Sequence, residues 1–132
     1  MIVVDTSAVI AIANNEPEAD ACIAAFTAHD EVLISAGTLL ETLIVASGKG
    51  ISESTKTVLS NMFHVTVDVT EDSARRASAA YRQWGKGFHP AGLNFGDCFA
   101  YALAKERNCP LLFIGNDFSK TDIRAALSVA GE

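Results

Sequence analysis

The sequence predicts an α/β domain built as a three-layer α/β/α sandwich around a central, mainly parallel sheet. Short apolar runs of strand type, at residues 2–4, 32–34 and 111–114, alternate with stretches of helical period. Runs that are apolar at every position indicate strands covered on both faces, which is typical of parallel sheets. At 132 residues the chain fits one domain, expected to span residues 1–132.

The first strand and the first helix meet at a polar turn. Residues 2–4 are β-branched and suit a buried strand. Asp5, Thr6 and Ser7 follow, and Thr6 or Ser7 is the predicted N-cap of a helix that extends to about residue 13.

Two further helices are expected before the middle of the chain. Pro17 between two glutamates predicts the first turn of a helix over residues 16–29. After the strand at 32–34, Ser35 is the expected N-cap of a helix that ends near Gly50. The expected core face of that helix carries Leu39, Leu40, Leu43, Ile44 and Ala46.

The second half of the chain repeats this alternation. Val65, Val67 and Val69 alternate with polar residues, which predicts a half-exposed strand at the edge of the sheet. Asn94 is the expected cap of the helix that precedes the strand at 111–114. The remaining predicted elements are helices over 52–62, 70–84 and 95–107, with a last short segment around 123–124.

The composition limits the class of protein. Hydrophobic residues make up 49% of the chain, so it is globular, and no run of about 18 apolar residues predicts a membrane span. The cysteines are odd in number and form no Cys-x-x-Cys pair, so we expect them buried and reduced, as in a cytoplasmic protein. They are Cys22, Cys98 and Cys109.

Four acidic residues lie where a parallel sheet would place a ligand. Asp5 directly follows the first strand and Asp117 follows the last, while Asp97 lies in the first turn of a helix. Glu41 lies in an otherwise apolar helix with no cation one turn away. Each alone has a simpler explanation, as a cap, a dipole partner, a turn residue or a solvent-facing side chain. Together with Asp122 they account for most of the net charge of −6, which is therefore weak evidence against a nucleic-acid substrate.

Several carboxylates at one point repel each other unless protons or a hard cation neutralise them. Carboxylates without Cys or His partners suit Mg²⁺ or Mn²⁺, and His29, His64 and His89 show no ligand spacing. A pair of cations about 3.5–4 Å apart is a common device for phosphodiester cleavage. An acidic site without a nucleophilic triad therefore indicates metal-assisted phosphodiester hydrolysis.

The order and spacing of these motifs resemble those of the PIN-domain VapC ribonucleases over essentially the whole chain. The segments that carry the resemblance are Asp5-Thr6-Ser7-Ala8, Glu41, Asn94-Phe95-Gly96-Asp97-Cys98, Gly115-Asn116-Asp117-Phe118 and Thr121-Asp122. The resemblance implies a PIN-like fold and a Mg²⁺-dependent endoribonuclease, with Mn²⁺ as a possible substitute. It also implies the toxin of a toxin–antitoxin pair, with RNA as substrate, a cognate antitoxin as partner and a homodimer as assembly.

The resemblance assigns roles to individual residues. Asp5 and Asp97 would be the main metal ligands, and Glu41 and Asp117 would complete the acidic, catalytic pocket, with Asp117 also on the metal. In a supporting role, Thr6 or Ser7 would orient Asp5. Asp122 would either bind metal through water or cap a turn.

Basic residues that could hold the RNA lie in two places. Lys120 is close in sequence to the last acidic residues, while Arg82 and Lys86 follow one predicted helix and its exit. A solvated helix face explains Arg82 and Lys86 equally well.

Other functions stay open at this point. One is a PIN-domain nuclease that processes RNA without an antitoxin, and another is a remnant that binds only an antitoxin. A phosphatase with Asp5 as nucleophile is disfavoured because Ser7 stands where a second Asp is usual. A receiver-like signalling domain, binding Mg²⁺ without turnover, would need a phosphoacceptor such as Asp68, which lies within an alternating strand.

Overall fold

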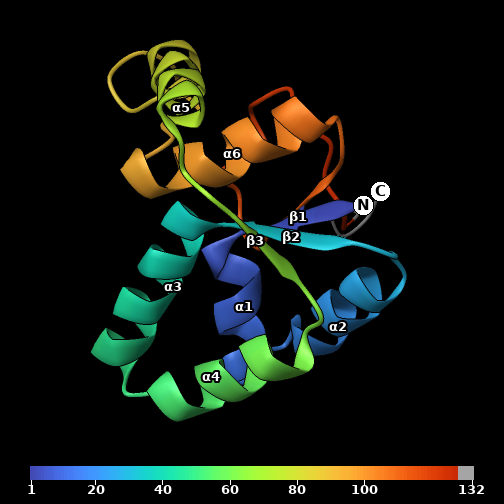
Figure 1. Cartoon of the computed structure of the whole chain (residues 1–132). Helices are drawn as coiled ribbons and strands as arrows, with labels where there is room; N and C mark the ends of the chain where they lie inside the picture. Colours follow the sequence, from blue (N-terminus) through green and yellow to red (C-terminus); the bar gives the residue numbers. More distant parts are fainter. Residues whose placement is uncertain (128–132) are drawn as a thin grey trace.

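A computed structural model describes residues 1–127 and contains a sheet whose four strands are all parallel (Figure 1). The strand order is β3-β2-β1-β4. The central strands are β1 (Ile2–Val4) and β2 (Val32–Ser35), and the outer ones are β3 (Val65–Val67) and β4 (Leu111–Leu112). The edge position expected for the alternating valine strand is confirmed.

Helices cover both faces of the sheet, so the predicted three-layer sandwich is confirmed (Figure 1). Helices α5 (Glu71–Trp84) and α6 (Phe95–Arg107) lie on one side. The other side holds α1 (Thr6–Ala13), α2 (Ala19–Thr27), α3 (Ala36–Lys49) and α4 (Ser52–Asn61). Within residues 1–127, no helix combines the length and the apolar character that crossing a membrane requires.

Alternating strand side chains build two cores, one on each face. Val3, Leu33 and Leu111 pack with α5 and α6 in one core. Ile2, Val4, Val32, Ile34 and Leu112 pack on the opposite side with residues of α1, α2 and α4. All three cysteines are buried and free, as expected.

Helix α3 presents the opposite face from the one predicted. Leu40, Leu43 and Ile44 are exposed by 60%, 41% and 62%, whereas Thr38 and Thr42 are fully buried. The Thr42 hydroxyl donates to the backbone oxygen of Thr38 at 2.8 Å, so its polarity is satisfied inside the protein. Of the five residues predicted for the core face, Ala46 is buried and Leu39 partly buried.

Three element boundaries also differ from the prediction. The N-cap of α1 is Asp5, whose side chain accepts a hydrogen bond from the backbone of Ser7. Residues 16–18 form a turn before α2, because Ala19 N donates to the oxygen of residue 16. The last strand ends at residue 112, since Ile114 N donates to the Ser7 hydroxyl instead of to a neighbouring strand.

Candidate active site

The four acidic residues singled out in the sequence line one cleft of about 340 Å³. The cleft lies beyond the carboxyl ends of β1 and β4, the usual ligand position in an open parallel sheet. Its lining residues are Asp5, Thr6, Ser7, Ile10, Glu16, Glu41, Val45, Lys49, Asn94, Asp97, Ile114 and Asp117.

Asp5 is buried at the end of β1 and held through only one of its carboxylate oxygens. Its Oδ2 accepts hydrogen bonds from the backbone nitrogen and the hydroxyl of Ser7, at 3.1 and 2.7 Å. Its Oδ1 is buried and has no hydrogen-bond partner among residues 1–127. Burial raises the pKa of Asp5 to about 6, the Ser7 hydrogen bonds oppose this rise, and the charge of Glu41 adds to it. One oxygen of Asp5 is therefore fixed and the other is available to a cation.

Asp97 is both a helix-capping residue and a wall of the cleft. Asp97 Oδ2 accepts from the backbone nitrogen of Asn94 at 3.0 Å, and the Asn94 side chain accepts from Asp97 N at 2.9 Å. This capping box begins α6. Burial, followed by the charges of Asp5, Asp117 and Glu41, raises the pKa of Asp97 to about 7, against the Asn94 hydrogen bond.

Glu41 reaches the cleft from α3 and lies against the first turn of α6. Its Oε1 accepts from the Thr6 hydroxyl at 2.7 Å, which itself lies 3.1 Å from the hydroxyl of Thr42. A Cβ at Gly96 would overlap the Glu41 carboxylate, so any larger residue there would require that carboxylate to move. The two threonines and Gly96 together fix the position of Glu41.

Asp117 approaches from the turn after β4. Gly115 adopts a φ of +94°, and Phe118 is buried and anchors the turn while Asp117 itself is exposed. Asp97 and Asp117 both line the cleft, and the charge of Asp117 contributes to the raised pKa of Asp97.

The residues of this cleft fit a hard divalent cation. Two buried carboxylates have pKa values raised to about 6 and 7, so their charged forms lack a neutralising partner. Within residues 1–127, no three His, Cys, Asp or Glu side chains are arranged to enclose one metal ion. Mg²⁺ is commonly held by one or two carboxylates, with water and substrate phosphate completing the shell, and such a site needs no protein cage.

Asp122, predicted as a supporting residue, lies outside the cleft. It accepts hydrogen bonds from the Tyr101 hydroxyl at 2.5 Å and from Lys105 at 3.0 Å. Tyr101 also accepts from the Trp84 ring nitrogen at 2.8 Å. Asp122 therefore links the segment after β4 to α6, and through Tyr101 to α5.

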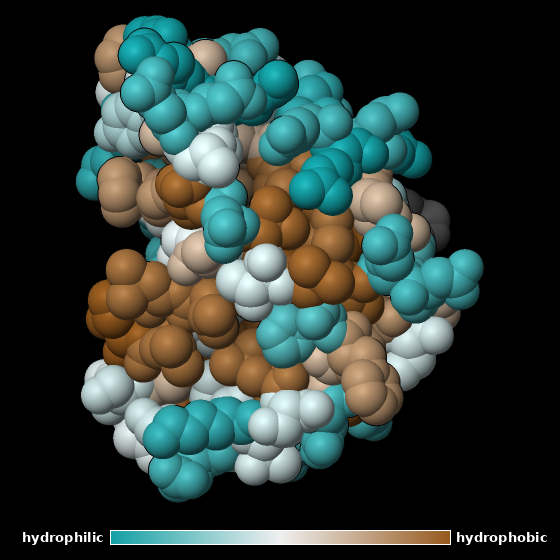
Figure 2. Space-filling model, viewed as in Figure 1, coloured by the Kyte–Doolittle hydropathy of each residue, from teal (hydrophilic) through white to brown (hydrophobic). Residues whose placement is uncertain are grey.

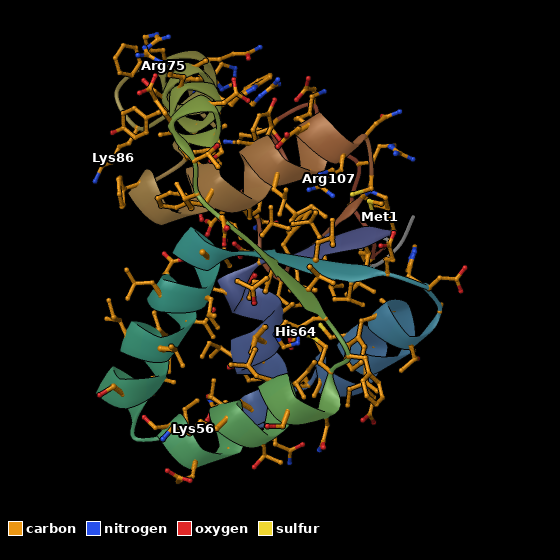
Figure 3. The ribbon with its side chains drawn as sticks, viewed as in Figure 1. Met1, Lys56, His64, Arg75, Lys86 and Arg107 are labelled. Carbon is orange, nitrogen blue, oxygen red and sulfur yellow. The ribbon has the colours of Figure 1, made fainter. Side chains whose placement is uncertain are left out.

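The basic residues predicted to hold RNA do not line the cleft either. Arg82 donates to Ser78 on its own helix, and Lys120 is exposed. Lys86 lies past the end of α5, on the side where α6 begins (Figure 3). Asp68, the phosphoacceptor that a signalling domain would need, is exposed and also lies away from the cleft.

Two charged residues of the cleft were missed from the sequence. Glu16 lies in the turn before α2, where a helix start was predicted. Lys49 lies at the end of α3, eight residues after Glu41 and four after Val45. That spacing places the three residues on one helix face, so the signal for Lys49 was present once Glu41 was a candidate.

The fold and the acidic cleft define a PIN domain, and comparison with known proteins agrees. The PIN domain family matches residues 2–124. "Ribonuclease VapC28" of Mycobacterium tuberculosis is 45% identical in an alignment of length 130 that covers 96% of this chain and 98% of the relative. "Ribonuclease VapC" of Mycolicibacterium smegmatis is 42% identical in an alignment of length 128 that covers 94% of this chain and 98% of the relative.

Solved structures of low sequence identity share the fold. VapC20 of Mycobacterium tuberculosis, described as a sarcin-ricin loop cleaving toxin, superposes with a TM-score of 0.76 at 18% identity, covering 93% of this chain and 96% of that one. A chain of a toxin–antitoxin complex from Klebsiella pneumoniae superposes with a TM-score of 0.72 at 19% identity, covering 98% of this chain and 100% of that one. The chain belongs to the PIN domain family and, within it, to the VapC ribonucleases.

Proposed function

We propose that this protein is a Mg²⁺-dependent endoribonuclease that acts in the cytoplasm as the toxin of a toxin–antitoxin pair. The observation that carries the proposal is the meeting of four carboxylates in one cleft, where the buried Oδ1 of Asp5 finds no hydrogen-bond partner in the described part of the chain, residues 1–127. Mn²⁺ is a suitable substitute because it prefers the same oxygen ligands. The family membership and the three buried, free cysteines support a reducing compartment as the place of action.

Each carboxylate has a role that follows from its surroundings. Asp5 and Asp97 would hold the cation, with Asp117 reaching it through water, and the bound cation would supply Lewis acidity and lower the pKa of water for attack on phosphorus. Ser7 and Asn94 orient Asp5 and Asp97 through the hydrogen bonds described above. Glu41 would keep its hydrogen bond from Thr6 and accept a proton from the attacking water.

A cognate antitoxin and a second copy of the chain are the proposed protein partners. Relatives of the fold include a chain of a toxin–antitoxin complex. Apolar side chains gather over α3 and near the start of α6 (Figure 2), with Leu40, Ile44 and Phe95 exposed by 60%, 62% and 78%. Contiguous exposed apolar surface indicates a protein interface. Light scattering of the purified chain, alone and after co-expression with the protein encoded directly upstream, tests both partners.

Cleavage of RNA with and without Mg²⁺ tests the activity. Asp97→Asn and Asp5→Asn should each lower the rate by at least about 100-fold while leaving the circular dichroism spectrum unchanged. Asp20→Asn is the matched control, because Asp20 is an exposed acid on α2 outside the cleft. Cleavage by Asp97→Asn at the wild-type rate, or by wild type in excess chelator, would contradict the proposal.

Calorimetric titration with Mg²⁺ gives a readout independent of activity. The wild type should bind the ion, and Asp5→Asn should bind it at least tenfold more weakly. An equal affinity in both proteins would remove Asp5 from the metal site.

A further inference from the structure

Lys49 is the one cation among the residues that line the cleft, as far as residues 1–127 describe it. The same cleft is lined by five carboxylates, those of Asp5, Glu16, Glu41, Asp97 and Asp117. A polyanion entering there meets repulsion on every side except at Lys49.

Lys49 is not engaged by any of these carboxylates. The ion pairs in residues 1–127 join Lys56 to Glu53, Arg75 to Glu71, Arg76 to Asp72 and Lys105 to Asp122. Lys49 has neither an ion pair nor a side-chain hydrogen bond within that part of the chain, and it is exposed. Its ammonium group is therefore available to a ligand.

The position of Lys49 on α3 determines which part of a substrate it would reach. Glu41, Val45 and Lys49 follow one another at intervals of four residues and all line the cleft. Glu41 and Lys49 are thus separated by about 12 Å along the helix axis. A strand cut between Glu41 and Asp97 would present to Lys49 a phosphate further along its backbone than the scissile one.

We infer that Lys49 binds a non-scissile backbone phosphate of the RNA and positions the strand along the α3 wall of the cleft. This inference rests on the proposed ribonuclease function. Because the contacted phosphate does not change during cleavage, the contact strengthens substrate and transition state equally. Loss of Lys49 should therefore raise KM and leave kcat nearly unchanged.

The purely structural alternative is that Lys49, as the last residue of α3, only complements the negative end of the helix dipole. That role would show as a loss of thermal stability without any change in KM. The two roles are therefore separable by kinetics.

Steady-state cleavage of a short RNA by Lys49→Ala, Lys49→Arg and Lys56→Ala tests the inference. Lys56 is the matched control, because it is an exposed lysine on α4, outside the cleft and already paired with Glu53. Figure 3 shows Lys56 on α4, below the end of α3, so any general effect of lost charge should appear there too. Lys49→Ala should raise KM about tenfold, a typical effect of losing a charged hydrogen bond. Lys49→Arg should bring KM most of the way back to the wild-type value, and Lys56→Ala should have the KM of the wild type.

A binding experiment gives the second readout. Fluorescence anisotropy of a labelled RNA, measured in the Asp97→Asn background to prevent cleavage, should show the affinity reduced by Lys49→Ala. The slope of log affinity against log salt should become shallower by about 0.7, the value for one phosphate contact on a single strand.

The outcomes separate the inference from the function on which it rests. If wild-type protein does not cut RNA in Mg²⁺, the proposed function is wrong. If it does cut, and Lys49→Ala matches Lys56→Ala in KM and in salt slope, the assignment of Lys49 is wrong. A fall in kcat with unchanged KM would equally overturn the positioning role.

Discussion

Ser7 connects the segment after β1 with the segment after β4 at the cleft. Its hydroxyl donates to Asp5 Oδ2 at 2.7 Å and accepts from Ile114 N at 3.0 Å. The first contact orients a carboxylate, and the second directs the chain out of the sheet towards Asp117. Under the metal role proposed for Asp5, Ser7 should matter almost as much as the ligand itself, as residues that orient a metal ligand commonly do.

Ser7→Ala should lower both Mg²⁺ affinity and cleavage rate by about 10- to 100-fold, because Asp5 loses its strongest orienting hydrogen bond. Titration calorimetry and cleavage assays measure the two effects. Ser60→Ala is a suitable control, since Ser60 is exposed on α4. Equal metal affinity in Ser7→Ala and Ser60→Ala would show that the hydroxyl has no orienting role.

Gly96 has no side chain, and the Glu41 carboxylate occupies the space where a Cβ would lie. Gly96→Ala should displace Glu41, because the added methyl group would overlap its carboxylate. We expect cleavage to fall by at least about tenfold with little loss of secondary structure, measured by single-turnover assays and circular dichroism. A crystal structure of the variant should show Glu41 in a new rotamer.

Gly48→Ala is the control for a glycine-to-alanine change in a helix. Gly48 is inside α3, and apart from its chain neighbours and the backbone of its own helix no atom of residues 1–127 would lie within 4 Å of a Cβ added there. This variant should keep full activity and gain about 0.5–1 kcal/mol in free energy of unfolding. Wild-type activity in both glycine variants would contradict the packing role of Gly96.

At the scale of secondary-structure elements, α3 shows why periodicity alone did not identify its buried face. Leucine and isoleucine spacing predicted the helix correctly, but the buried side carries Thr38, Thr42 and Ala46. Small residues allow α3 to approach α1 closely, and the Thr42 hydroxyl lies 3.1 Å from the Thr6 hydroxyl of α1. The buried Thr38 hydroxyl has no hydrogen-bond partner among residues 1–127. A search for large apolar residues selects the exposed face instead.

Leu40→Ser and Ile44→Ser should change the free energy of unfolding of the isolated chain by no more than about 0.5 kcal/mol each, as is usual for exposed positions. Urea denaturation at low protein concentration measures this. A loss of more than about 2 kcal/mol in a monomeric sample would mean that the face is covered within the chain. In the same variants, weaker self-association or weaker antitoxin binding would support the proposed interface.

The site itself was predictable from the sequence only in part. The four carboxylates could be named because strand ends and helix starts of a parallel sheet converge, and the structure brings them to one cleft. Their metal and catalytic roles stay predictions. Asp122 was misplaced because its partner Tyr101 lies 21 residues away and no local pattern marks the pair. Glu16 was missed because its turn resembles the first turn of a helix.

At the scale of the whole molecule, the parallel sheet could be predicted because its strands are apolar at nearly every position. Ile2–Val4 and Leu111–Leu112 are entirely buried, as strands covered on both faces must be. Strand order and pairing could not be derived in this way, since they depend on contacts between distant segments. The assignment of residues 1–132 to a single domain stays a prediction, because the structure describes residues 1–127.

The burial of acidic groups makes the stability of the metal-free protein depend on pH. The pKa of Asp5 is raised to about 6 and that of Asp97 to about 7, against an ordinary value of 3.8. Between pH 3.8 and about pH 7 the folded chain binds more protons than the unfolded chain, so the free energy of unfolding falls as pH rises. This contribution is fully present below about pH 3.8 and is lost as pH rises through 6 to 7.

In excess chelator, therefore, the melting temperature of wild type should fall between pH 5 and pH 8 more steeply than that of Asp97→Asn, which lacks one of these groups. Mg²⁺ should raise the melting temperature more at pH 8 than at pH 5, because it binds the deprotonated carboxylates. Thermal denaturation followed by circular dichroism measures both effects. Parallel pH profiles for the two proteins would contradict the raised pKa of Asp97.

The hydrogen bond between Ser7 and Ile114 spans 107 positions of the chain. A nascent polypeptide that has emerged only as far as α5 lacks Asp97, β4 and Asp117, and its Ser7 has nothing to meet. The proposed catalytic cleft therefore forms only after the chain has been synthesised beyond Asp117. Products truncated before Asp97 should not cleave RNA.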